Sequence, residues 1–180
     1  IEAACAYFET TGKDTLLKVM IKNADHIYDV FLKNKHEGYP GHPEIELALL
    51  RLYEVTGNEK YLHLAKHFID IRGVDPHYYE KERQSRNWTV WNGDGRNHEY
   101  QQSSAPVREQ RDAVGHSVRA VYLYTAMADL AAKTDDKELF DADLKGAVAI
   151  VIGSEGDGMG RLVKENCDFV LSLPMKGRLN

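Results

Sequence analysis

The chain has 180 residues, of which 43% are hydrophobic, 28% charged and 9% aromatic, with 14 glycines and only 5 prolines. This composition is typical of an ordinary globular protein and excludes the intrinsically disordered and collagen-like classes. The 23 basic and 28 acidic side chains give a net charge of −5, so no global positive field would draw the chain onto DNA or an anionic membrane surface.

The two cysteines, Cys5 and Cys167, lie far apart in the sequence and away from any histidine pair. Their spacing excludes a local zinc knuckle and a disulfide framework. No segment approaches the roughly 18 consecutive apolar residues of a membrane span. Together these features favour a cytoplasmic location. A helical pattern begins directly after Ile1, so we expect the natural protein to begin earlier.

Three short segments with a shared local pattern separate apolar helical runs: residues 11–17, 56–62 and, more weakly, 134–140. Gly12 and Gly57 stand where a left-handed cap residue commonly ends a helix. We therefore predict tight turns within helical hairpins. Apolar residues around these turns recur with the 3.6-residue period of one buried helix face. The pattern predicts helices over residues 16–31, over two segments of 47–69, and over about 111–132.

The connections between the predicted hairpins are longer, and the one over about residues 73–109 is rich in aromatic side chains and histidines. A loop of this length within a compact domain is usually functional. In a stack of helical hairpins, short turns fall at one end and long connections at the other. At that second end we expect five side chains to converge: His42, Glu44, His98, Tyr100 and His116.

Each candidate also has a purely structural interpretation. Pro43 opens a predicted helix, and Glu44 and Glu46 could serve only as acids that complement the dipole of its first turn. Because they are two residues apart, these glutamates point in different directions and cannot form a paired acid–base couple. His42 needs no such structural role, and a histidine of this kind is a candidate ligand-binding residue.

His116 follows Gly115 inside the third predicted helix. A glycine there costs about 1 kcal/mol relative to alanine, so we expect another part of the backbone to approach closely. The structural alternative for His116 is a histidine packed in the core. The aromatic side chains of the long loop could likewise form a small satellite core or stack against a sugar ring.

The pattern changes after about residue 143. Residues 147–152 form a continuous β-branched apolar run, residues 153–160 a glycine-dense loop, residues 161–165 a short helix, and residues 169–173 a second strand. We therefore place a domain boundary near Ala142. The glycine-dense loop is neither a dinucleotide fingerprint nor a P-loop, although its exposed backbone amides could cradle a ligand.

Five strings in the helical part occur in the order of a known family: GYPGHPEIEL (38–47), HEYQQ (98–102), PVREQ (106–110), AVGHSVRAVY (113–122) and MADL (127–130). Through them, residues 1 to about 141 resemble the β-L-arabinofuranosidase family, glycoside hydrolase family 127. The resemblance implies a mainly α fold, part of an (α/α)6 barrel. It also implies that His42 and His116 are substrate-binding residues that contact an arabinofuranose-containing sugar.

In a complete protein, the resemblance implies retaining hydrolysis of a β-L-arabinofuranoside through a covalent glycosyl-cysteine. The family's general acid, its cysteine nucleophile, and its glutamate and cysteine zinc ligands lie beyond the matching part, and Cys5 corresponds to none of them. We therefore expect no catalytic residue, metal ligand or cofactor in this chain. The family usually has His-x-Pro-Val where this chain has Ser104-Ala105-Pro106-Val107, which calls one usual polar contact into question.

A second set of strings lies near the end of the chain: VIGSEGDGM (151–159), LV (162–163), CD (167–168) and LPMKG (173–177). These resemble the SPOUT-type RNA 2′-O-ribose methyltransferases. The resemblance implies a fragment of a knotted α/β domain in which backbone at Gly153 and Leu173 contacts S-adenosylmethionine and Glu155 shapes the RNA-facing side. The family's last motif would begin after Asn180, and its catalytic arginine has no counterpart here.

The simplest interpretation is a composite of two truncated pieces, residues 1–142 and 143–180, with a true fusion as the alternative. The first functional hypothesis is a glycosidase fragment that is inactive by itself. The second is a fragment of an S-adenosylmethionine-dependent RNA methyltransferase, the only interpretation with an RNA partner. The third is a non-catalytic carbohydrate-binding or interaction module, in which apolar faces of an incomplete barrel favour a homo-oligomer.

Overall fold

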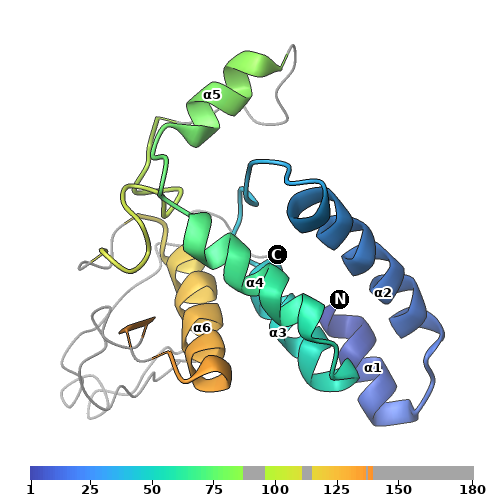
Figure 1. Ribbon diagram of the computed structural model, residues 1–180. Coiled ribbons are helices and arrows are strands. Elements are labelled where there is room, and N and C mark those ends of the chain that lie inside the picture. The colour runs from blue at the N-terminus through green and yellow to red at the C-terminus, as the bar shows by residue number, and fades with distance from the viewer. Residues whose placement is uncertain (87–95, 111–114, 137, 140–180) are drawn as a thin grey trace, which may run out of the picture. The chain divides into compact units, whose positions relative to one another are not determined.

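The computed structural model describes residues 1–86, 96–110, 115–136 and 138–139 (Figure 1). The chain divides into two compact units, residues 1–145 and 146–180, and the described residues all belong to the first. They are mainly helical and include no β-strand. None of the described helices has the length and apolarity needed to cross a membrane.

The first hairpin consists of α1 (Glu2–Thr11) and α2 (Thr15–Tyr28), and a π-helical turn (Asp29–Lys33) extends α2. Gly12 ends α1 with φ 69°, and its N–H donates to Phe8 O at 2.7 Å. This left-handed conformation is easily adopted by glycine because it has no Cβ. The predicted turn is confirmed.

The second hairpin consists of α3 (Ile45–Thr56) and α4 (Glu59–Ile71). Gly57 ends α3 with φ 66°, and Asn58 caps α4 by accepting the N–H of Lys60 at its Oδ1, 3.3 Å away. A side-chain acceptor at this position satisfies one of the N–H groups that a helix start leaves unpaired. The second predicted turn is confirmed too.

Two further helices follow, α5 (Tyr78–Ser85) and α6 (Ser117–Thr134). The prediction of a helix from about residue 111 needs a correction, because α6 begins at Ser117. His116 is its N-cap, with φ −83° and ψ 117°, rather than a residue of its first turns. Asp135 ends α6 in the left-handed conformation, with φ 52°.

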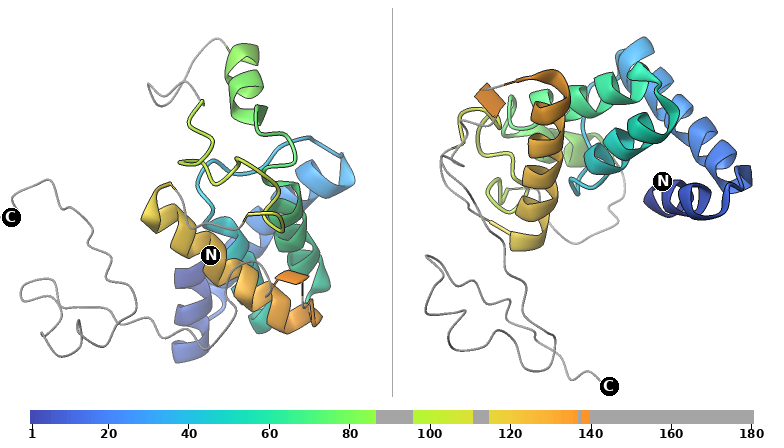
Figure 2. Two further views of the ribbon diagram at one scale, coloured as in Figure 1. Left: turned by 90° about the vertical axis from the view of Figure 1, so that its left-hand side faces the viewer. Right: turned by 90° about the horizontal axis from the view of Figure 1, so that it is seen from below.

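The α3–α4 pair lies at the centre of the helices, with α1 and α2 packed on one side and α6 on the other (Figures 1 and 2). The side chains that these helices bury between them are mostly large and aliphatic. Each stabilises the fold by roughly 1.5–3 kcal/mol relative to an exposed position. The fully buried ones include Leu49, Leu50, Leu52, Leu64, Phe68, Ile69, Leu123 and Leu130.

Some apolar side chains that the periodicity assigns to buried faces are exposed, and this part of the prediction is wrong. Leu16 on α2 and Val118, Val121 and Tyr122 on α6 are all more than a third exposed, Val121 by 53%. Periodicity identifies an apolar face but not its partner, and these side chains stay partly open to solvent.

The features predicted beyond Ala142 lie outside the described residues. They are the two strands, the glycine-dense loop, the short helix, the proposed cofactor contacts at Gly153 and Leu173, and Cys167. They, and the boundary near Ala142, stay predictions.

Candidate functional site

The long connections meet at one end of the helices, where α3 and α6 begin and α4 ends (Figure 1). Segments far apart in the sequence bring two histidines together there. The ring of His42 packs edge-on against Tyr122, with centroids 5.7 Å apart. The ring of His116 packs against Tyr100 in the same manner at 5.2 Å. We call these four residues, with Arg119, the histidine cluster.

Arg119 links the parts of this cluster from its position on the first turn of α6. Its Nη1 donates to Gly41 O at 2.8 Å and to Gln101 Oε1 at 2.6 Å. Its guanidinium lies 4.6 Å from the centroid of the Tyr100 ring, a cation–π contact. Arg119 therefore joins the loop before α3 to the loop that carries Tyr100.

Burial lowers the pKa of His42, and the nearby charges of Arg119 and His116 act in the same direction against the opposing effect of Glu44. His42 is therefore neutral near pH 7. Its Nδ1 is buried without a hydrogen-bond partner among the described residues, as is Nδ1 of His116. Glu44 Oε1 lies 3.2 Å from Nδ1 of His42 but is not aligned for a hydrogen bond. A neutral imidazole offers both a donor and an acceptor, which suits the hydroxyl groups of a ligand.

A buried arginine supports the histidine cluster from behind. Arg72 follows the last turn of α4, is wholly buried, and donates from Nη2 to Pro40 O at 2.8 Å and from Nη1 to Gln101 O at 3.1 Å. Tyr79 accepts from Arg72 at 3.2 Å and donates to Pro40 O at 2.7 Å. Arg72 thus fixes the backbone of the same two loops that Arg119 joins at the surface.

Glu46 completes this buried group, because its Oε1 lies 3.2 Å from Nη2 of Arg72 and its side chain is wholly buried. The interpretation of Glu46 as an acid that merely complements the helix dipole is therefore wrong: it is the counter-ion of Arg72. Burial raises the pKa of the Glu46 carboxyl although the charge of Arg72 opposes this. Burial likewise raises the pKa of Tyr79.

The expected convergence of five residues holds for four of them. Glu44 lies beside His42 and Tyr100 beside His116. His98 lies elsewhere: its Nε2 is 2.8 Å from Oε1 of Glu80, and its ring packs on that of His77 with centroids 5.0 Å apart. His98 contacts Glu80 on α5 instead of joining the other four residues. The spacing of these residues in the sequence does not indicate that contact.

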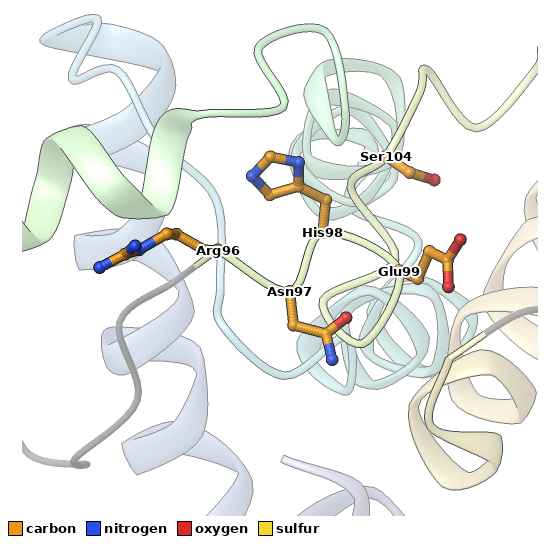
Figure 3. A pocket seen from close by; sticks show the side chains of 5 residues that line it. All are labelled: Arg96, Asn97, His98, Glu99 and Ser104. Atoms are coloured by element: carbon orange, nitrogen blue, oxygen red, sulfur yellow. The ribbon is translucent and has the colours of Figure 1, made fainter.

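The loop that carries His98 lines an open pocket formed by Arg96, Asn97, His98, Glu99 and Ser104. Figure 3 shows that the side chains of His98 and Asn97 project to opposite sides of this loop. All five of these lining side chains are polar or charged. The pocket therefore offers less to a sugar ring than the histidine cluster with its two tyrosines.

The sequence patterns did not identify Arg72 and Arg119, the two residues that hold the loops of the site together. Arg119 lies three residues after His116 in the AVGHSVRAVY string, so its position one helical turn away was a usable signal. Arg72 had no comparable signal, because its partners come from positions 40, 46, 79 and 101.

Gly115 has the close backbone neighbour that its sequence context indicated. Its φ is 82°, and a Cβ built there would lie 2.1 Å from Glu99 O. The expectation of a close approach is confirmed, although Gly115 precedes α6 rather than lying inside a helix. This contact sets the backbone of His116 against the loop of Tyr100.

The described residues do not fit a zinc site built from cysteine and glutamate. Cys5 is wholly buried in α1 among core side chains, and burial raises the pKa of its thiol. A raised pKa disfavours the thiolate that binds metals.

Comparison with known proteins gives a family match over residues 1–145, to the β-L-arabinofuranosidase, GH127 catalytic domain. A non-reducing end β-L-arabinofuranosidase from Bifidobacterium longum subsp. longum is 42% identical over 150 residues; the match covers 78% of this chain and 22% of that protein.

Solved structures give the same result. A GH127 β-L-arabinofuranosidase from Geobacillus stearothermophilus T6 is 52% identical with a TM-score of 0.69, over 78% of this chain and 22% of that one. A second GH127 β-arabinofuranosidase is 38% identical with a TM-score of 0.61, over 78% and 20%. The chain therefore spans only about a fifth of the length of these relatives.

The C-terminal part has matches of another kind. A 23S rRNA (guanosine-2′-O-)-methyltransferase from Pseudomonas aeruginosa is 51% identical over 45 residues, covering 25% of this chain and 18% of that protein. The corresponding protein of Ralstonia nicotianae is 50% identical over 42 residues, covering 23% and 17%.

Proposed function

Because the chain belongs, through residues 1–145, to the β-L-arabinofuranosidase family GH127, we propose that it forms part of the sugar pocket of such an enzyme. The helical hairpins would be part of an (α/α)6 barrel, as the family resemblance implies. The ligand would be an arabinofuranose-containing sugar. The chain covers only about a fifth of its relatives, so this proposal concerns binding rather than turnover.

The observation that carries the proposal is the meeting of His42 and His116 in the histidine cluster. They come from connections 74 positions apart, and each has an Nδ1 without a hydrogen-bond partner among the described residues and a ring beside a tyrosine. Imidazole nitrogens can bind sugar hydroxyls, while the faces of Tyr100 and Tyr122 suit the apolar side of a furanose. Arg119 supports the cluster because it hydrogen-bonds to both the loop of Gly41 and the loop of Gln101.

We expect no hydrolysis by this chain. A retaining glycosidase needs a proton donor and a nucleophile on opposite sides of the scissile bond. Glu44, the acid that lies 3.2 Å from Nδ1 of His42, is more than half exposed. The one described cysteine, Cys5, is buried in the core.

The test is a calorimetric titration of the full chain with methyl β-L-arabinofuranoside. We expect binding that His42→Ala and His116→Ala each weaken by about tenfold or more, which corresponds to about 1.4 kcal/mol. The matched control is His63→Ala, because His63 is an exposed histidine on α4. Equal binding by all four proteins would contradict the proposal.

A parallel assay with an aryl β-L-arabinofuranoside tests the absence of turnover. We expect no release of the aryl group above the uncatalysed rate. Hydrolysis that His42→Ala abolishes would show that the chain holds a complete active site, and would overturn this part of the proposal.

A second candidate function rests on the 51% identity to an rRNA methyltransferase over 45 residues. Under this interpretation the C-terminal part would be a fragment of an S-adenosylmethionine-dependent RNA 2′-O-methyltransferase, with Gly153 and Leu173 at the cofactor. Titration with S-adenosylmethionine tests it. Micromolar binding weakened by Gly153→Val would support this candidate, and the absence of binding would remove it.

A further inference from the structure

Three metal-ligating side chains meet where α5 begins, outside the histidine cluster. Nδ1 of His77 and Nε2 of His98 each lie 2.8 Å from the same carboxylate oxygen, Oε1 of Glu80. The ligand atoms of the three residues all lie within 4.8 Å of one another. The two imidazole rings stand perpendicular, with an interplanar angle of 90°.

We propose that His77, Glu80 and His98 bind a divalent transition-metal ion, with Zn²⁺ as the best-fitting candidate. Two imidazoles and one carboxylate form a ligand set that zinc commonly takes, with a fourth position left for water or another ligand. Mg²⁺ and Ca²⁺ prefer sites dominated by oxygen. The mixed nitrogen and oxygen ligands therefore select against these two ions.

The separations suit an ion at the centre of the three groups. With metal–ligand bonds of about 2.0–2.1 Å, ligand atoms lie roughly 3.3 Å apart in a tetrahedral site. The two nitrogen–oxygen distances of 2.8 Å need to open by only about half an ångström to reach that value. The nitrogens lie no more than 4.8 Å apart, so moderate rotation of the two rings brings both onto one ion.

The local structure prepares two of the ligands. His77 is the N-cap of α5 and Glu80 lies in its first turn, so helical geometry places them on the same side. The start of α5 is itself fixed by Asp75, whose Oδ1 accepts the N–H of His77 at 3.1 Å and whose Oδ2 pairs with Lys81 at 2.7 Å. Two ligands three residues apart on one helix end form a preorganised half-site.

The third ligand comes from a tight turn in another loop. Ser103 donates its N–H to His98 O at 2.9 Å, and Tyr100 donates its N–H to Asn97 Oδ1 at 2.9 Å. These bonds hold the backbone of His98 in a turn, with the imidazole directed at α5. The side chains of Glu80 and His98 are each 23% exposed, so an ion has a path from solvent.

The proposal does not depend on the sugar-binding function. The zinc ligands that the family resemblance implies are glutamate and cysteine, whereas this site contains no cysteine. A bound ion would fasten α5 to the loop that also carries Tyr100 and Gln101, and so would stabilise one wall of the histidine cluster.

The test uses the full chain, freed of metal by a chelator and titrated with ZnCl₂ in a calorimeter. We expect one equivalent to bind with micromolar or lower Kd. His98→Ala and Glu80→Gln should each raise the Kd by at least about tenfold, since even loss of an outer-shell partner costs 10–100-fold. The controls are His63→Ala, an exposed histidine on α4, and Cys167→Ser, and both should bind like the parent chain.

A second readout separates loss of a ligand from loss of the fold. Circular dichroism melting without metal should give the same transition for the parent chain and both ligand variants, and Zn²⁺ should raise the transition of the parent chain alone. Co²⁺ in place of Zn²⁺ should give a visible spectrum without a thiolate charge-transfer band. Zinc binding that survives His98→Ala and Glu80→Gln, or that Cys167→Ser abolishes, would overturn the proposal.

Discussion

Arg72 and Glu46 form an ion pair in which neither side chain is exposed, with Nη2 of the arginine 3.2 Å from Oε1 of the glutamate. Arg72 stands at the end of α4 and Glu46 in the first turn of α3. The same guanidinium donates to the carbonyl oxygens of Pro40 and Gln101. One buried charge pair therefore fixes both loops that carry the histidine cluster.

Replacing Arg72 by alanine should lower the free energy of unfolding by about 3–5 kcal/mol, because it leaves the buried Glu46 carboxylate without a counter-ion. Urea denaturation followed by circular dichroism measures the change. The control is Arg51→Ala, since Arg51 pairs with Glu9 and Glu54 at the surface. Exposed pairs contribute up to about 1 kcal/mol, so similar losses in the two variants would contradict the assigned role of Arg72.

Alanine at Gly115 should disturb the histidine cluster far more than alanine at Gly12. Both glycines have positive φ, at 82° and 69°. A Cβ on Gly115 would lie 2.1 Å from the backbone oxygen of Glu99, whereas one on Gly12 meets nothing within 4 Å. Gly12→Ala should cost about 1 kcal/mol from backbone conformation alone, and Gly115→Ala clearly more.

The measurement for this glycine pair is urea denaturation together with amide NMR spectra. We expect Gly115→Ala to shift the amide signals of residues 98–103 and 115–119. The same signals should stay in place in Gly12→Ala. Equal free energies of unfolding in the two variants would contradict this prediction, because the loop of Glu99 would then make room for the added Cβ at no cost in stability.

His67 should make the chain less stable as the pH falls below about 6.5. Burial lowers its pKa, and its Nε2 has no hydrogen-bond partner among the described residues. The unfolded chain has the ordinary histidine pKa of about 6.5 and takes up a proton that the folded chain resists. The stability from this group is thus present above about pH 6.5 and is lost as the pH falls toward the lower pKa of the folded chain.

Urea denaturation at pH 7.5 and 5.5 measures this dependence, which cannot exceed about 1.4 kcal/mol per pH unit for one proton. His67→Gln should make the pH dependence smaller. His42, whose pKa burial lowers as well, should act in the same direction, whereas the raised pKa of Glu46 should act in the opposite one. The control is His63→Gln, one turn earlier on α4, which should keep the pH dependence of the parent chain. If His63→Gln reduced this pH dependence as much as His67→Gln does, the dependence could not be assigned to His67.

Arg119→Gln should weaken binding of methyl β-L-arabinofuranoside by about tenfold, or about 1.4 kcal/mol. The variant loses the contacts with Gly41 O and Gln101 Oε1 and the charge over the Tyr100 ring. Arg119→Lys keeps the charge but lacks the planar guanidinium, so it should bind at an intermediate level. Calorimetric titration ranks the three proteins, and a glutamine variant that binds like the parent chain would contradict the supporting role of Arg119.

The local features of the fold could be predicted from sequence. Gly12 and Gly57 end their helices in the left-handed conformation that their positions indicated. The apolar period identified the hairpins, and the family strings identified His42 and His116. These signals are local, because helical period and caps depend on residues within a few positions of one another.

The sequence by itself therefore determined the two hairpins, their turns, the family and the two histidines of the cluster, but not α5, which lies in the segment expected to be a loop. Only the tertiary structure decided that Glu46 is buried against Arg72, that His98 lies with Glu80 rather than with His116, and that His116 begins α6 instead of lying within it. Each of these results depends on which loops meet when the helices pack. Residues 18 to 78 positions apart supply the partners, and no local pattern encodes such pairings.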